Sequence, residues 1–184
     1  MFKYDLGNGA DLRILEVRHA PIFFDFTVAN RAYLGEWLGW ANTIITVEDA
    51  QNFIKRGMMR LAEDGLPWVG IWQADQMVGG MLFFPVEWRI RATEIGYWLG
   101  QEAAGRGLMT RSVRAMLGYA FDAIQLNRVG LKAEVDNTRS RAIAERLGFT
   151  FEGIQRQGWI NANGDHLVDM ASYAMLASDW QAQK

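Results

Sequence analysis

Segments that favour strands and segments that favour helices alternate in an order that restricts the fold to a mixed sheet. Strand-forming runs occupy residues 12–17, 68–73, 77–86, 94–99, 129–135, 150–160 and 167–176. Helical patterns occupy residues 22–40, 47–63, 108–124 and 137–147, and the first of these segments is expected to form one or two short helices. Because helices separate the strands at several points along the chain, we expect an α/β fold with helices on both faces of the sheet.

Three local signals set the ends of these elements. Thr46 and Asp49 have the spacing of a capping box, which predicts a helix that starts near residue 47. Gly148 follows the last helical run, where glycine tolerates the left-handed cap conformation. The Asn163-Gly164 step predicts a hairpin between the last two strands.

Length and composition fit one folded domain. The chain has 184 residues, half of them hydrophobic, with no repeat and no Pro/Gly/Ser-rich linker, so we expect a single domain over residues 1–184.

The absence of cysteine excludes disulfide scaffolds and thiolate nucleophiles, and it favours a cytoplasmic location. The longest nearly apolar run, residues 77–86, is too short for a membrane span of about 20 residues. The first residues also lack a signal-peptide pattern.

Charge is unevenly distributed along the chain. Residues 105–146 hold eight basic and four acidic side chains and carry +4, so the remainder carries −6 of the total of −2. This asymmetry is typical of a protein that binds a polyanion on one part and a cation on the other, although scattered solvated charges would also produce it. The slightly acidic total argues against broad nucleic-acid binding.

A Gly-x-Gly turn links one strand to the next helix. Gly105, Arg106 and Gly107 follow the strand at 94–99 and open the helix at 108. The amides at a helix N-terminus lack internal partners, so they bind anions such as pyrophosphate, and glycine lets the backbone approach the ligand. Gly107 is followed by Leu108 rather than by Lys, which excludes a P-loop, and Thr110 stands where a Rossmann fingerprint needs a small residue.

Several motifs in this order resemble the GNAT superfamily of acetyl-CoA-dependent N-acetyltransferases, and in particular its RimJ/RimL-like ribosomal-protein branch. The resemblance rests on the run 94–110, on Asn137-Thr138-Arg139-Ser140 with the later Gly148-Phe149, on the aromatic segment 34–40 and on the Asn163-Gly164 hairpin. It implies a mostly antiparallel, twisted sheet of about seven strands. It also implies acetyl-CoA as co-substrate and allows a homodimer.

The resemblance assigns a binding role to residues of the strand, the loop and the following helix. Backbone amides of the loop with Thr110 would hold the pyrophosphate of coenzyme A, and the strand would align the pantetheine arm together with Asn137. A backbone amide at Trp98 or Leu99 would stabilise the oxyanion. The residues assigned to the co-substrate are Tyr97, Trp98, Leu99, Gly105, Arg106, Gly107, Leu108, Met109, Thr110, Asn137 and Ser140.

Two residues are candidates for proton transfer. Many members protonate the leaving sulfur with a tyrosine where this chain has Ala144, so Ser140, as in the RimL-like branch, is assigned that role. Glu94 occupies the position from which many members draw a base that acts through water. Alternatively, Ser140 is a capping or surface serine and Glu94 is a solvated strand-edge residue.

The chain departs from the pattern of its relatives at further positions. Glu102 replaces the first residue of the Gln/Arg-x-x-Gly-x-Gly pattern, and we expect it to point to solvent. Some RimL-like enzymes place a glutamate base in the penultimate strand, where this chain has Gly158-Trp159. Glu94 is therefore the residue assigned as the base, because the penultimate strand offers no glutamate at that point.

Trp37 and Trp40 are spaced by one helical turn, and they are candidates for the acceptor site because the early helical region borders that site in the family that the chain resembles. Core packing is the alternative for both. His19 and His166 lack metal-ligand spacing, so no metal is expected.

The resemblance implies direct transfer of acetyl from acetyl-CoA to a neutral amine, with a protein N-terminal α-amine as the expected acceptor. A polyamine or another small amine is the enzymatic alternative. A non-catalytic module that binds a peptide in a tryptophan-lined groove is the alternative from another class.

Overall fold

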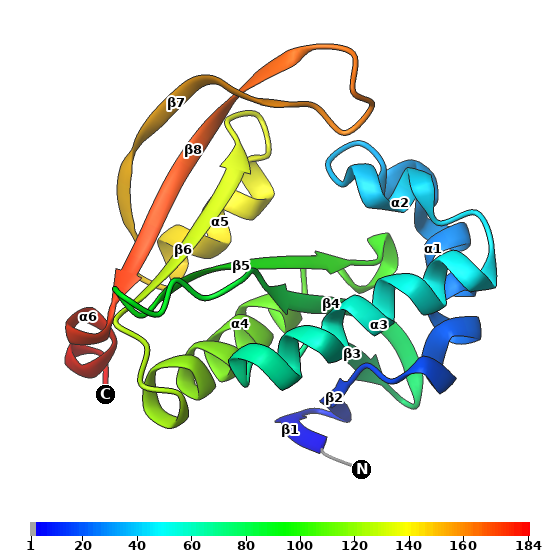
Figure 1. The fold of residues 1–184 in the computed structure, drawn as a ribbon, viewed down its shortest axis with the longest axis horizontal. Helices are drawn as coiled ribbons and strands as arrows, with labels where there is room; N and C mark the ends of the chain where they lie inside the picture. The colour runs from blue at the N-terminus through cyan, green and yellow to red at the C-terminus, as the bar shows by residue number, and fades with distance from the viewer. Residues whose placement is uncertain (1–2) are drawn as a thin grey trace.

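A twisted eight-stranded sheet forms the centre of residues 3–184, which are the residues that the computed structural model describes (Figure 1). The strands lie in the order β1-β2-β3-β4-β5-β6-β8-β7. They are β1 (Lys3–Gly7), β2 (Ala10–Ile14), β3 (Val69–Gln73), β4 (Gln76–Phe83), β5 (Ala92–Leu99), β6 (Arg128–Glu134), β7 (Thr150–Ile160) and β8 (Leu167–Leu176). The helices are α1 (Ala20–Leu34), α2 (Gly39–Thr43), α3 (Val47–Asp64), α4 (Leu108–Gly118), α5 (Thr138–Arg146) and α6 (Ala177–Ala182).

The sheet splits between β5 and β6. These two strands are the parallel pair of an otherwise antiparallel sheet, and their register joins Ala92–Glu94 to Arg128–Gly130. Beyond this short contact β5 runs on beside β4, whereas β6 runs on beside β8, so the two strands diverge (Figure 1). We call the space between the diverging ends the β5–β6 gap.

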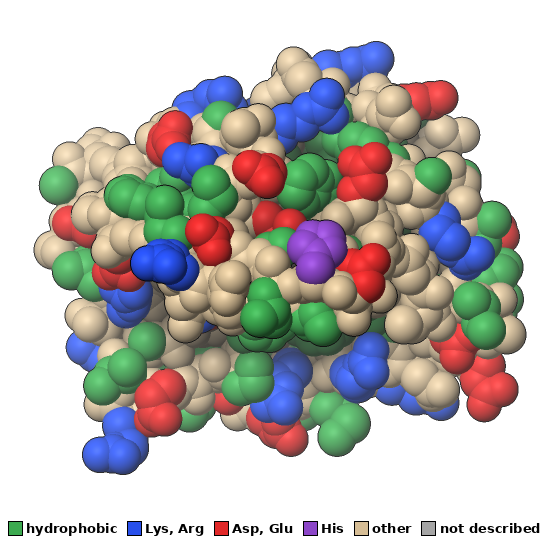
Figure 2. All heavy atoms as spheres, turned by 90° about the horizontal axis from the view of Figure 1, so that it is seen from above, with side chains coloured by type: hydrophobic (Ala, Val, Ile, Leu, Met, Phe, Trp, Pro, Cys, Tyr) green, Lys and Arg blue, Asp and Glu red, His purple; other side chains and the backbone are tan. Residues whose placement is uncertain are grey.

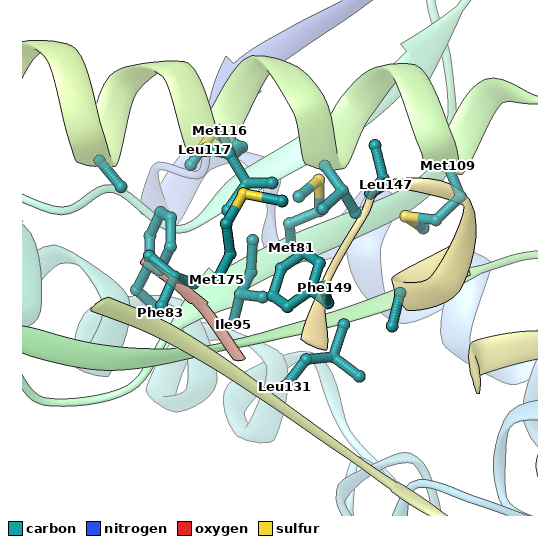
Figure 3. Close-up of a cluster of buried hydrophobic side chains, with 14 of the residues drawn as sticks. Met81, Phe83, Ile95, Met109, Met116, Leu117, Leu131, Leu147, Phe149 and Met175 are labelled. Atoms are coloured by element: carbon teal, nitrogen blue, oxygen red, sulfur yellow. The ribbon is translucent and has the colours of Figure 1, made fainter. Parts of the chain in front are cut away.

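Each face of the sheet has its own hydrophobic core. One core packs α4, α5 and α6 against the sheet, and Figure 3 shows Met116 and Leu117 of α4 above Ile95 and Leu131. The other core packs α1, α2 and α3 against Trp98 and its neighbours. Side chains of a strand point to alternate faces, so Tyr97 lies on the α4 face and Trp98 on the α1 face.

Glycines in two adjacent strands make room for tryptophan rings on the α1 face. A Cβ atom on Gly80 would lie 2.3 Å from the indole of Trp98, and one on Gly70 would lie 2.8 Å from the indole nitrogen of Trp72. The sheet therefore accommodates two large rings because its own side chains are missing beneath them.

The expected local signals are confirmed. Thr46 Oγ1 accepts a hydrogen bond from the Asp49 amide and the Asp49 carboxylate accepts one from the Thr46 amide, so the capping box starts α3 at Val47. Gly148 follows Leu147, the C-cap residue of α5, and its φ of 81° is the expected left-handed conformation. The sheet with helices on both faces is confirmed as well.

Four details differ from the sequence-based expectations. The sheet gains β1, which pairs with β2 at the edge. The first predicted strand ends at Ile14, because a 3-10 turn occupies Val17–His19. The helix predicted to reach residue 124 ends as α4 at Gly118 and continues as a π-helical turn over Tyr119–Ala123. The short helix α6 covers the α4 face through Trp180 and was not expected. Within residues 3–184, no helix is long and apolar enough to cross a membrane.

Candidate active site

Beyond Glu94, the edge of β5 that faces the β5–β6 gap pairs with no strand of residues 3–184. The Phe84 amide donates to the carbonyl of Glu94 at 2.9 Å, and the Gly100 amide donates to the carbonyl of Val78 at 2.8 Å. Since antiparallel strands bond at every second residue, the alternation turns the peptide groups of Tyr97 and Leu99 away from β4 and toward the gap. Of the two amides considered for the oxyanion, the alternation therefore favours Leu99 over Trp98.

The loop that opens α4 has the geometry of an anion site. Gly105 and Gly107 have φ values of 79° and 69°, a conformation that side chains rarely adopt, and Gly107 is the N-cap of α4. The side chains of Leu108 and Met109 are buried, so these residues offer only their amides to a ligand. At the N-terminus of an 11-residue helix, these amides and the helix dipole favour a negative group.

Guanidinium groups surround the same loop. Arg111 Nη1 donates to the carbonyl of Arg106 at 3.5 Å, and Arg146 Nη1 donates to Thr110 Oγ1 at 3.2 Å. The Nε atom of Arg111 is buried and has no hydrogen-bond partner among the described residues. Arg111 thus keeps at least one donor that the described residues do not use, and an arginine beside an anion loop suits a phosphate ligand. Glu102 is exposed, in line with the expectation that it points to solvent.

Ser140 lies in the first turn of α5, at the edge of the β5–β6 gap. Asn137 is the N-cap of this helix, and its side-chain oxygen accepts a hydrogen bond from the Ser140 amide at 3.1 Å. The capping role considered for Ser140 thus belongs to Asn137, and the Ser140 hydroxyl is not used as a cap. The phenol oxygen of Tyr97 lies 3.0 Å from Ser140 Oγ and 3.1 Å from the Ser140 carbonyl oxygen. Burial raises the pKa of Tyr97 to about 12.

Glu94 lies on the opposite face of the sheet from Ser140. It shares the face of Trp98 by strand alternation, whereas Tyr97, the partner of Ser140, faces α4. The Glu94 carboxylate is 2.7 Å from Nζ of Lys132 on β6, and both side chains are more than a third exposed. Glu94 also lines a pocket of about 390 Å³ with Phe84, Arg128 and neighbouring residues.

Trp37 and Trp40 occupy different environments. Trp40 lies in α2 and packs against the rings of Phe23, Phe53 and Trp98 at centroid distances of 5.7, 5.0 and 5.1 Å. Trp37 lies in the turn between α1 and α2 and is half-buried. The early segment thus forms two helices, α1 and α2, as one of the two expected arrangements, and the turn between them separates Trp37 from Trp40.

The β7–β8 hairpin reaches across to α2. A Cβ atom on Gly39 would lie 3.1 Å from the carbonyl oxygen of Ala162 at the tip of the hairpin. Figure 1 shows the hairpin arching over the open ends of β5 and β6 toward α2. The gap is thus bounded by α1 and α2 on one side and by the hairpin on another.

Acidic side chains gather where β6 ends beneath this hairpin. The pKa of Glu134 is raised overall. Burial is the largest cause, the charge of His166 acts against it, and the charge of Asp136 adds to it. Asp165 contacts His166 at 2.7 Å. Figure 2 shows acidic side chains around a histidine on the face seen from above.

Two contacts of this site escaped sequence reasoning. Lys132 is the ion-pair partner of Glu94, and its strand alternation with buried Leu131 and Ala133 was the available signal that it faces away from α4. The Tyr97 phenol reaches α5, although its position on β5 had suggested only a backbone role. No local pattern predicts that contact, because the two residues are 43 positions apart.

A mixed sheet that opens between two parallel strands, with an anion loop at one end of the opening, defines an acyltransferase fold. The sequence matches the family of the Acetyltransferase (GNAT) domain over residues 11–150, so the chain belongs to the GNAT acetyltransferase family. It is an N-acetyltransferase, and acetyl-CoA is its co-substrate. The arginine-lined loop fits the phosphates of that molecule.

Individual relatives agree with this family. The putative ribosomal N-acetyltransferase YdaF of Bacillus subtilis (strain 168) is 31% identical over 186 residues and is matched over 100% of both chains. The ribosomal-protein-serine acetyltransferase of Escherichia coli (strain K12) is 25% identical over 152 residues, which are 83% of this chain and 85% of the relative. A solved structure of RimL, a ribosomal L7/L12 alpha-N-protein acetyltransferase in complex with coenzyme A, has a TM-score of 0.89 at 27% identity and covers 97% of this chain and 99% of that chain.

Proposed function

We propose that this chain transfers acetyl from acetyl-CoA to the N-terminal α-amine of a protein by direct attack across the β5–β6 gap. The observation that carries the proposal is the placement of Glu94 and Ser140 on opposite faces of the sheet, beside the same gap. A thioester held in the gap would receive the amine from the Glu94 side and release its sulfur on the Ser140 side.

The residues share the proton transfers as follows. Glu94 accepts a proton from the attacking amine through a water molecule while the new C–N bond forms. The Leu99 amide donates a hydrogen bond to the thioester oxygen, where negative charge develops. As the C–S bond breaks, its electron pair stays on sulfur, Ser140 gives its hydroxyl proton to that sulfur, and Ser140 regains a proton from water.

The residues around the loop hold the donor. Amides of Gly107, Leu108 and Met109 with Thr110 bind the pyrophosphate, and Arg106, Arg111 and Arg146 offset its charge. The gap-facing peptide groups of Tyr97 and Leu99, with Asn137, align the pantetheine arm. The amide oxygen of Asn137 is occupied by the cap bond to Ser140, so its NH₂ group is the part available to a ligand.

Three observations favour a protein N-terminus as the acceptor. First, two relatives of the chain are named as a putative ribosomal N-acetyltransferase and a ribosomal-protein-serine acetyltransferase, and both names point to a protein acceptor. An α-amino group with a pKa of about 7.7–8 is roughly a tenth neutral at pH 7, whereas a lysine is far less so, and a base that acts through water suffices for the former. The acidic groups Glu134, Asp136 and Asp165 suit a positively charged segment near the amine.

The acceptor side is bordered by the α1–α2 turn, where Trp37 lies, and by the β7–β8 hairpin. Trp37 is the better placed of the two proposed acceptor residues, because Trp40 is engaged in ring packing. The cysteine-free chain fits a reducing compartment, and we propose the cytoplasm as the place of action.

The test is release of free CoA thiol from acetyl-CoA in the presence of a panel of amines. Peptides with N-terminal serine or alanine should give release, and N-terminally blocked versions of the same peptides should give none. Release with spermidine but not with peptides would show that the acceptor is a polyamine rather than a protein N-terminus, and the proposed direct transfer of acetyl would still hold. Binding of CoA without release by any amine would instead favour a peptide-binding module.

A further inference from the structure

The phenol of Tyr97 holds the hydroxyl of Ser140 at the edge of the gap. Its oxygen lies 3.0 Å from Ser140 Oγ and 3.1 Å from the carbonyl oxygen of the same residue. The two residues come from β5 and α5, 43 positions apart, and this contact joins the two sides of the split sheet. The Asn137 side chain fixes the Ser140 amide at the same time, so the backbone and the hydroxyl of Ser140 are both held.

The number of protons limits what this contact can do. A carbonyl oxygen only accepts hydrogen bonds, whereas each hydroxyl donates one and accepts others. If Tyr97 donates to the Ser140 carbonyl, the proton of Ser140 is drawn toward the phenol oxygen. If Tyr97 donates to Ser140 Oγ, the proton of Ser140 is free to point into the gap.

We propose that Tyr97 is a positioning residue that donates its hydrogen bond to Ser140 Oγ and thereby directs the serine proton to the departing sulfur. This inference rests on the proposed role of Ser140. As Ser140 loses its proton to sulfur, negative charge develops on Oγ, and a hydrogen bond to a charged acceptor is stronger than one to a neutral hydroxyl. Tyr97 keeps its own proton throughout, and Ser140 is reprotonated by water.

Burial of the phenol supports its role as a hydrogen-bond donor that does not give up its proton. The pKa of Tyr97 is raised to about 12, so the phenol stays protonated at every pH at which the enzyme would be assayed and remains a donor. A tyrosine that gave its own proton to the sulfur would instead need a lowered pKa, closer to the pH of the reaction. The Ala144 position, where many relatives carry such a tyrosine, offers no hydroxyl in this chain.

The first experiment compares Tyr97→Phe, Ser140→Ala and the double variant of the full chain, with the amine that gives the fastest thiol release. Tyr97→Phe should lower kcat about tenfold, the rate equivalent of one hydrogen bond, and leave the KM for acetyl-CoA nearly unchanged. In the Ser140→Ala background the same change should have almost no further effect, because the serine through which Tyr97 acts is missing.

A matched control removes a hydroxyl of the same kind elsewhere. The phenol of Tyr119 donates to the backbone carbonyl of Gly65 at 3.1 Å, and Tyr119 follows the C-terminal end of α4, whereas the anion loop lies at its N-terminal end. Tyr119→Phe should leave kcat unchanged. The melting temperature and the Kd for CoA are measured for every variant, and turnover is expressed per CoA-binding site, so that a loss of folded protein is not read as a loss of rate.

The second experiment changes the leaving group. With acetyl-seleno-CoA the departing selenolate needs no proton near neutral pH, so the effect of Tyr97→Phe on kcat should nearly vanish. The inference is overturned if Tyr97→Phe keeps the wild-type kcat, if it costs the same rate with and without Ser140, or if the loss is equal for both donors. An unchanged kcat of Ser140→Ala would instead refute the proposed function of Ser140 itself.

Discussion

The carboxylate of Glu94 and the ammonium of Lys132 meet at 2.7 Å across the β5–β6 gap. Glu94 belongs to the last register pair that joins the two strands, and Lys132 lies two residues beyond the end of that pairing on β6. The ion pair therefore fixes the proposed base at the point where the sheet begins to open. It also places a positive charge beside the position at which the amine would lose its proton.

Glu94→Gln should lower kcat about a hundredfold without changing the Kd for CoA, because it removes the base and leaves the anion loop intact. Lys132→Met should lower kcat by less, since the carboxylate remains but loses its fixed orientation. Both partners are more than a third exposed, so we expect either variant to change the free energy of unfolding by less than about 1 kcal/mol. Steady-state kinetics with urea denaturation check both points, and a wild-type kcat for Glu94→Gln would exclude it as the base.

Gly107→Ala should weaken CoA binding, because the N-cap of α4 has a φ of 69° that alanine adopts only with strain. The matched control is Gly164→Ala in the β7–β8 turn, where φ is 77° and a Cβ atom has open space. Both variants should lose about 1 kcal/mol of stability. Calorimetric titration should find a higher Kd for CoA only in Gly107→Ala, and an equal Kd in both would contradict the position assigned to the pyrophosphate.

Trp40→Ala should lower the free energy of unfolding by about 3 kcal/mol, because its ring packs against Phe23, Phe53 and Trp98. Trp37→Ala should cost much less stability and should raise the KM for the amine while the KM for acetyl-CoA stays the same. Thermal unfolding and two-substrate kinetics separate the two effects. If Trp37→Ala leaves the KM for the amine unchanged, the α1–α2 turn does not bind the acceptor.

Asp11 predicts a pH dependence of stability that is independent of catalysis. Burial raises the pKa of this carboxyl, but hydrogen bonds and charges from Arg13 and Lys3 outweigh it, so the pKa is lowered overall. A lowered pKa in the folded state stabilises the fold above the unfolded value of about 3.9, and the contribution is lost as the pH falls through the folded value. Asp11→Asn should therefore cost about 2 kcal/mol at pH 7 and progressively less below pH 4, as measured by urea denaturation.

The control for that experiment is Asp75→Asn. Asp75 contacts the same arginine at 2.6 Å, but its side chain is 87% exposed. Water screens such a partner, so we expect a change of less than about 0.5 kcal/mol at neutral pH. Equal losses for the two aspartates would show that burial of Asp11 is not the source of the effect.

Features that depend on neighbours along the chain could be predicted from the sequence. The capping box of Thr46 and Asp49, the cap at Gly148 and the Gly105–Gly107 turn that opens α4 are short-range features, and each is found where it was expected. Seven of the strands follow from local runs of strand formers. Strand β1 was missed because its pattern is polar and exposed, so pairing with β2 rather than burial stabilises it.

Features that depend on distant partners could not be predicted from one sequence. The ion pair of Glu94 with Lys132 and the contact of Tyr97 with Ser140 arise from the angle at which β5 and β6 diverge. Likewise, the spacing of Trp37 and Trp40 indicated one helical face, but a turn separates them, because α1 ends at Leu34. These positions follow from tertiary packing, which local periodicity does not record.

The divergence of β5 and β6 gives the sheet two strand edges in its interior. Proteins usually cover or charge their strand edges, because unpaired peptide groups attract foreign strands. Here the peptide groups of Tyr97 and Leu99 that face the gap are not paired with β6, and an elongated ligand could lie along them as an additional strand would. If acetyl-CoA binds there as proposed, it would complete the hydrogen bonding of the sheet only while it is bound, so we expect the two halves of the sheet to hold together more firmly in the donor-bound enzyme than in the free one.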